Sequence, residues 1–167
     1  MAIEYDLDIS TRSPAVEIAD WLAEIGRNNG VFDAPITGGQ LIDKGAFVYT
    51  RLGTCITVAP QRPPHPWDPI VSGLGFAPTV SVGFRMGKEE ETSDQQDDMI
   101  SLVAPLLERV DGDAVLHFQF EQVWLLRKAG ELSLSEDDDL WRPRRLALVT
   151  QPCRRQTHII DEERSGQ

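Results

Sequence analysis

The sequence predicts an α+β fold, in which a mostly antiparallel sheet carries two amphipathic helices on one face. Short segments alternate apolar and polar residues, which is typical of strands with one buried face. Two longer segments instead place apolar residues at helical spacing. The order of elements also repeats, because a strand, a helix and three strands are expected over residues 1–59 and again over residues 79–135. We therefore expect two βαβββ-like halves.

The first half begins with the clearest strand signal. Residues 2–9 alternate between apolar side chains and the acids Glu4, Asp6 and Asp8. Residues 15–25 then carry apolar side chains on one helical face and lead to an Asn-Asn-Gly stop, which predicts a helix. Glycine-containing turns separate three short predicted strands, at residues 40–43, 46–51 and 54–59.

The second half follows the same order. Residues 79–86 alternate again, and a second helix is predicted to begin near Thr92 or Ser93. The apolar face of that helix contains Met99, Leu102, Val103, Leu106 and Val110. Three further strands are predicted at residues 114–121, 123–128 and 131–134, and an apolar run at residues 146–150 is expected to form an edge strand.

A proline-rich segment joins the two halves. Residues 60–78 contain six prolines and two glycines, a composition that favours neither a strand ladder nor a helix. We expect a long ordered loop or an internal linker. A chain of 167 residues fits one domain, which we place at residues 1–155, followed by a frayed tail at residues 156–167.

The charge balance narrows the classes of partner. The chain has 27 acidic and 16 basic residues, a formal net charge of −11. Nucleic-acid binding normally requires a basic surface that displaces counterions, so this composition argues against it. A basic protein partner is favoured instead, because opposite charge accelerates encounter and helps to select the partner.

Two acidic segments, at residues 88–98 and 136–139, concentrate this charge. Acids before and within the first turn of a helix also complement its dipole, so a purely solvated, helix-capping role is the alternative to binding. The binding hypothesis adds Trp141 as an aromatic anchor. The predicted contact residues are Glu89, Glu90, Glu91, Asp94, Asp97, Asp98, Asp137, Asp138, Asp139 and Trp141.

Catalytic and cofactor motifs are missing from the sequence. It contains no nucleophile elbow, P-loop, dinucleotide fingerprint or zinc-protease motif, so we expect a non-enzymatic protein without a cofactor. Cys55 and Cys153 form no metal-binding or disulfide pattern. His65, His117 and His158 are widely separated and lack ligand spacing. An acidic N-terminus and the lack of a long apolar run predict a cytoplasmic protein without a membrane partner.

Several segments resemble a family of small bacterial immunity proteins associated with swarm-inhibition toxins, which pass between kin cells by outer-membrane exchange. The resemblance covers residues 1–9 and 79–149 and includes Phe84, Lys88, Gly112-Asp113, Leu125-Leu126-Arg127-Lys128, Gly130-Glu131-Leu132, Trp141-Arg142-Pro143 and Leu146. It implies a protein that neutralises a cognate toxin by binding it. No catalytic residue is carried over from the family.

The paired βαβββ order also resembles the vicinal oxygen chelate superfamily, whose members bind a metal or small ligand inside a cupped sheet. This alternative, a small-molecule-binding protein or metalloenzyme, requires a concave sheet lined by Glu4, Ser81, His117 and Glu121. His117 is the only histidine on a predicted strand, so a metal site of that kind would be incomplete. No pattern in the sequence predicts an oligomeric state.

Overall fold

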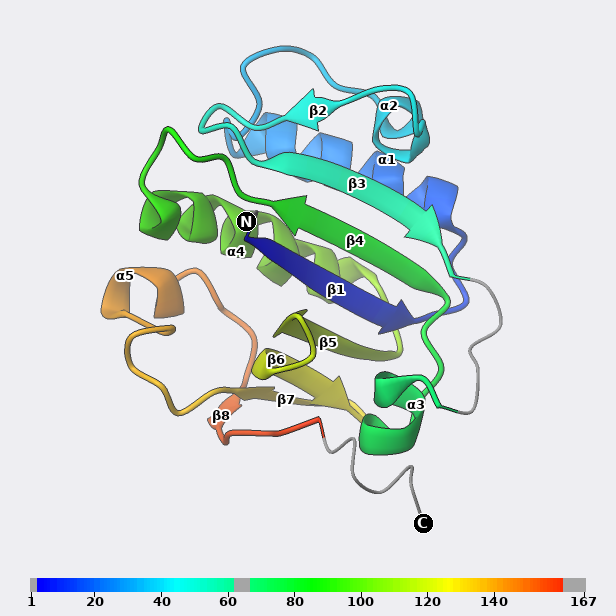
Figure 1. Ribbon diagram of the computed structural model, residues 1–167, viewed down its shortest axis with the longest axis vertical. Helices are drawn as coiled ribbons and strands as arrows, with labels where there is room; N and C mark the ends of the chain where they lie inside the picture. The colour runs from blue at the N-terminus through cyan, green and yellow to red at the C-terminus, as the bar shows by residue number, and fades with distance from the viewer. Residues whose placement is uncertain (1–2, 62–66, 161–167) are drawn as a thin grey trace.

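A computed structural model describes residues 3–61 and 67–160 of the chain. These residues form an eight-stranded sheet and five helices, seen in Figure 1. The elements in chain order are β1 (Glu4–Ser10), α1 (Ala15–Asn28), α2 (Gly38–Ile42), β2 (Val48–Tyr49), β3 (Cys55–Pro60), α3 (Pro69–Leu74), β4 (Val80–Arg85), α4 (Thr92–Arg109), β5 (Asp113–Phe118), β6 (Gln122–Lys128), β7 (Glu131–Leu134), α5 (Pro143–Leu146) and β8 (Arg154–Arg155).

The predicted fold class is confirmed. The strands lie in the order β2-β3-β4-β1-β5-β6-β7-β8, and every neighbouring pair is antiparallel except β7 and β8. Strand β1 pairs with β4 on one side and with β5 on the other. The first strand of the chain therefore joins two strands that come from the second half of the sequence.

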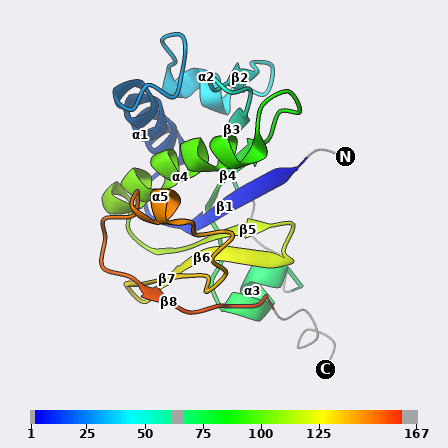
Figure 2. The same ribbon diagram turned by 90° about the vertical axis from the view of Figure 1, so that its left-hand side faces the viewer.

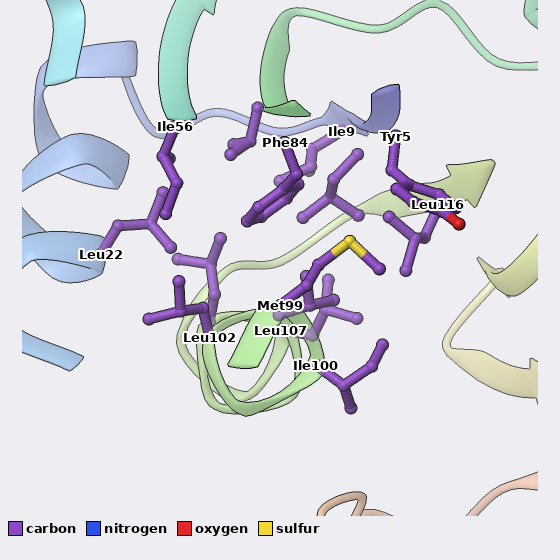
Figure 3. Packing of buried hydrophobic residues seen from close by; sticks show 14 of the residues in the cluster. Tyr5, Ile9, Leu22, Ile56, Phe84, Met99, Ile100, Leu102, Leu107 and Leu116 are labelled. Carbon is purple, nitrogen blue, oxygen red and sulfur yellow. The ribbon is translucent and has the colours of Figure 1, made fainter. Parts of the chain in front are cut away.

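The two long helices, α1 and α4, pack on one face of the sheet, as Figure 2 shows. Their apolar stripes bring Leu22 and Leu102 against strand residues such as Ile56, Phe84 and Leu116, all of them 1% exposed or less (Figure 3). Burying each such side chain contributes about 1.5–3 kcal/mol. The apolar residues of the alternating strands thus form the main core together with the apolar stripes of the two helices.

The short helix α3 covers part of the opposite face. Its apolar residues meet side chains of β5 and β6 that point away from the main core, in a second cluster made of Ile70, Leu74, Phe76, Val115, Val123, Leu126 and Ile160. Among the residues that the structure describes, no helix lies over β3, β4 and β1 on this side of the sheet (Figure 1). We call this uncovered region, together with β2, the open face.

A buried arginine ties α4 to the sheet. Arg127 on β6 donates hydrogen bonds to the carbonyl oxygens of Leu107, Val110 and Gly112. These carbonyls belong to the end of α4 and the turn that follows it, where backbone acceptors have no partner within the helix. A cation at this end also complements the helix dipole.

Residues 40–42 form part of helix α2 and Asp43 caps its end, so the strand predicted at residues 40–43 is wrong. Thr37 and Gln40 make a capping box, in which the Thr37 side chain accepts from the Gln40 backbone N–H and the Gln40 side chain accepts from the Thr37 N–H. This cap starts α2 at the Gly38-Gly39 pair, although glycine disfavours a helix. The next predicted strand, at residues 46–51, shortens to Val48–Tyr49.

The proline-rich segment 60–78 contains helix α3, which corrects the expectation of a loop or linker. Asp68 accepts a hydrogen bond from the backbone N–H of Ile70 at 2.9 Å, and Pro69 occupies the first turn, where a missing N–H costs nothing. Residues 62–66, which include His65, lie outside the described residues.

The end of the chain also differs from its prediction. Residues 143–146 form the short helix α5, and the edge strand is β8, which lies beside β7 at residues 154–155. Part of the expected frayed tail packs against the fold, since the Gln156 N–H donates to the Leu134 carbonyl at 2.8 Å and Ile160 is buried. Residues 161–167 lie outside the described residues.

Two glycines with positive φ angles offer a test of this backbone. A Cβ at Gly112 (φ 98°) would lie 1.8 Å from the Ser10 carbonyl oxygen, whereas a Cβ at Gly130 (φ 81°) would meet nothing within 4 Å. We expect Gly130→Ala to cost about 1–2 kcal/mol from conformational strain alone. Gly112→Ala should cost about 3 kcal/mol or more, because the strand end must also move. Equal urea-unfolding free energies for the two variants would contradict this packing.

Candidate functional site

The first predicted acidic segment is held in place by a buried glutamine. The Gln95 side chain is fully buried in α4. Its Oε1 accepts hydrogen bonds from the Gly87 N–H at 2.7 Å and the Thr54 hydroxyl at 2.8 Å, while its Nε2 donates to the carbonyls of Gly87 and Glu90. The loop that carries Glu89, Glu90 and Glu91 is therefore fixed to both α4 and the sheet.

The second acidic segment is attached to the first by Arg145, which is 1% exposed. Its guanidinium donates to Asp97 Oδ1 at 2.8 Å and to the Ser93 carbonyl at 3.0 Å, both in α4. It also donates to the Leu140 carbonyl at 2.7 Å, directly after the second segment. Arg145 thereby links the helical part of the first acidic segment to the backbone that directly follows the second.

The structure divides the ten predicted contact residues into exposed and internally paired groups. Asp97 pairs with Arg145, and the buried Asp98 forms a two-point ion pair with Arg51, at 2.9 and 3.2 Å. These two charges are neutralised within the fold. The exposed members are Glu89, Glu90, Glu91, Asp94, Asp137, Asp138 and Asp139, of which Asp138 also forms an exposed ion pair with Arg155 at 3.3 Å.

Trp141 is a core residue, which corrects its predicted place at the surface. Its side chain is 2% exposed, and its indole N–H donates to the Trp124 carbonyl oxygen at 3.0 Å. The two indole rings make an edge contact with centroids 6.1 Å apart. The tryptophan that precedes Arg142 therefore contributes to packing beneath the acidic segments and is not a surface anchor.

A second group of polar residues lies on the sheet, where β1 meets β5. Asp8 and His117 are buried, and Asp8 Oδ2 lies 2.7 Å from His117 Nε2. The Phe120 N–H donates to His117 Nδ1 at 3.1 Å, which places the ring proton on Nε2, where it is donated to Asp8. The Phe120 ring stacks on the imidazole at 4.6 Å. Both ring nitrogens of His117 are thus occupied by structural hydrogen bonds.

Beside this pair, two carboxylates converge over a glycine. A Cβ at Gly83 would lie 3.6 Å from Glu4 Oε1, 3.8 Å from Asp6 Oδ1 and 2.9 Å from Thr57 Oγ1. Within residues 3–61 and 67–160, the carboxylates of Glu4 and Asp6 have neither a hydrogen bond nor an ion pair. Burial is the largest cause that raises the pKa of Asp6; together with the negative charges of Asp8 and Glu4, and against the lowering effect of His117, it brings this pKa to about 6.

The residue set required by a vicinal oxygen chelate site does not assemble. Glu121, predicted to share a strand face with His117, lies exposed in the turn after β5, because that strand ends at Phe118. His117 is committed to Asp8 and to the backbone. In the part of the chain that the structure describes, no group of three His, Cys, Asp or Glu side chains is arranged to hold a metal ion.

Across the described ranges, no helix combines the length and the apolar character needed to cross a bilayer.

Fold and surface together define an α+β protein that carries two exposed acidic segments on a helix-backed sheet. The chain belongs to the SitI3-like family, whose family model matches residues 3–145, from β1 into α5. This is an immunity-type family, so the coarser part of the predicted resemblance is confirmed. The match also spans the proline-rich segment, which the resemblance had left out. No curated protein and no solved structure matches the chain.

The carboxylates over Gly83 predict a pH-dependent stability. Because the pKa of Asp6 is about 6 in the folded chain and lower when unfolded, protonation stabilises the fold at about pH 4, and this effect is lost as the pH rises through 6. Asp6→Asn should raise the unfolding temperature by a few degrees near neutral pH, and the gain should shrink on acidification. Glu17→Gln on α1 controls for removal of one exposed charge. A gain that does not change with pH would contradict the assignment.

Because Arg145 attaches the second acidic segment, its substitution should cost much more unfolding free energy than substitution of the nearby Arg142. Arg145→Met leaves Asp97 and two backbone carbonyls without their partner, and should cost about 3–5 kcal/mol of unfolding free energy. Arg142 is exposed and donates to Ser93 Oγ at 3.4 Å, so Arg142→Met should cost less than about 1 kcal/mol. Urea unfolding of both variants measures the difference, and similar losses would show that Arg145 is not the anchor.

Proposed function

We propose that this protein binds and neutralises a cognate toxin without catalysing a reaction, and that it acts in the cytoplasm. Membership of the SitI3-like family carries the proposal. The toxin is of the swarm-inhibition type, which is transferred between kin cells by outer-membrane exchange. A net charge of −11 favours a toxin with a basic surface.

The exposed acidic residues supply the first contact with that toxin. Two segments supply seven exposed carboxylates, and their backbones are held by Gln95 in the first segment and by Arg145 after the second. A rigid acidic surface costs little ordering on binding and steers a basic partner at long range. If the toxin is a nuclease, such a surface would compete with nucleic acid for its basic groove.

Co-expression tests the function directly. The toxin encoded beside this gene should kill cells when expressed alone and should be harmless, and co-purify, when this chain is also expressed. A toxin that stays lethal in the presence of a folded chain, with no complex recovered, would disprove the proposal.

The steering role predicts a change in association rate. Glu89→Lys/Glu90→Lys should lower the association rate constant about tenfold at low salt, with a smaller effect at high salt, because the charges act before contact. The matched control Glu17→Lys/Glu131→Lys makes the same change in net charge at exposed positions outside the two segments. Stopped-flow or surface-binding kinetics measure both variants. Equal rates for the two would remove the steering role and leave toxin binding itself intact.

A further inference from the structure

Two large aromatic side chains stand exposed at one edge of the open face. Phe47 is 71% and Tyr49 is 56% exposed, although they flank the buried Val48 of β2. Val48 points into the core beneath the helices, so alternation along the strand directs its neighbours to the other side of the sheet. The register places Tyr49 opposite Cys55, Cys55 opposite Arg85 and Arg85 opposite Glu4. A row of side chains thus crosses four strands.

The surface around Phe47 and Tyr49 is hollowed on several sides. Both residues line a hollow of about 190 Å³ with Cys55 and Arg85. Phe47 also lines a largely apolar hollow of about 480 Å³ that includes Thr57 and residues of α2. A third hollow lies between Tyr49 and the loop of Glu89 and Glu90. The aromatic edge is therefore continuous with the first acidic segment.

The middle of the open face carries excess negative charge. Its charged residues on β1 and β4 are the carboxylates Glu4, Asp6 and Asp8 and the guanidinium of Arg85. Asp8 is occupied by His117 and by the Gln61 amide. Glu4 and Asp6 converge over Gly83 and, among the described residues, have no partner. Asp6 is partly buried and Glu4 is exposed, and two adjacent carboxylates of this kind repel each other and attract a cation.

We propose that the open face of β2, β3, β4 and β1 is a protein-docking surface, on which the partner packs apolar side chains against Phe47 and Tyr49. A lysine or arginine of the partner then enters between Glu4 and Asp6 over Gly83. This inference rests on the proposed function, since the partner is the toxin. Exposed aromatic residues are the usual anchors of such interfaces, and charge-assisted hydrogen bonds to two carboxylates provide specificity.

Docking of a cation makes binding depend on pH. The charged and titratable groups facing Asp6 are Glu4 and Asp8 on its own strand and His117 on β5, with Arg85 in the next row on β4. A cation is attracted to the ionised carboxylate, so affinity should fall as the pH drops through the region in which Asp6 takes up a proton. Asp6→Asn should abolish this part of the pH dependence.

Equilibrium binding of the full chain to its toxin tests the surface. Phe47→Ser/Tyr49→Ser should weaken binding about 100-fold or more, and Glu4→Gln/Asp6→Asn about tenfold with a flattened pH profile. Val16→Ser/Ile159→Ser removes two other exposed apolar side chains, 60% and 75% exposed, and should leave binding unchanged. Because Asp6→Asn is expected to stabilise the chain, its loss of affinity is not explained by unfolding.

The outcomes separate this inference from the proposed function. Tight binding of the wild-type chain together with wild-type affinity in both open-face variants would overturn the docking surface and leave the function standing. A wild-type chain that neither binds nor protects would overturn both. A wild-type dimer that Phe47→Ser/Tyr49→Ser dissociates, with toxin affinity unchanged, would assign the open face to a second copy and also overturn the proposal.

Discussion

Strand β1 is the element on which the rest of the structure depends. It pairs with β4 on one side and β5 on the other, and its alternate residues face two different environments. Leu7 and Ile9 are fully buried beneath the helices, whereas Asp6 and Asp8 point to the opposite side. One short strand thus supplies the centre of the core and the charged centre of the open face, because a strand side chain alternates with a period of two.

Buried polar side chains decide where the surface segments lie. Arg127, Gln95 and Arg145 each donate to backbone carbonyls from positions at most 9% exposed. A buried polar group that is fully hydrogen-bonded fixes one arrangement, since any other leaves it without partners. These residues hold the end of α4 and both acidic segments, so the exposed carboxylates that we assign to toxin binding rest on a rigid support.

Alternation or helical spacing predicts elements that are stabilised by a periodic apolar face. Examples are β1, β4, α1 and α4. The short helices α2 and α3 escaped prediction because their caps, not periodicity, start them: Thr37 with Gln40 in one and Asp68 with Pro69 in the other. Most of the carboxylates predicted as contact residues lie exposed, and their role in binding stays a prediction. Trp141 was misplaced because its sequence neighbours are charged, while its packing partner Trp124 lies on β6.

The sequence by itself determined the α+β class, the acidic balance and the family, since composition, periodicity and motif residues are local properties of the chain. Only the tertiary structure decided which carboxylates are free. Asp98 is neutralised by Arg51 and Asp8 is bonded to His117, contacts that join residues 47 and 109 positions apart. Glu4 and Asp6 become a distinct pair only because β4 brings Gly83 beside them. Charge pairing across a sheet depends on register, and register is set by the packing of the whole molecule.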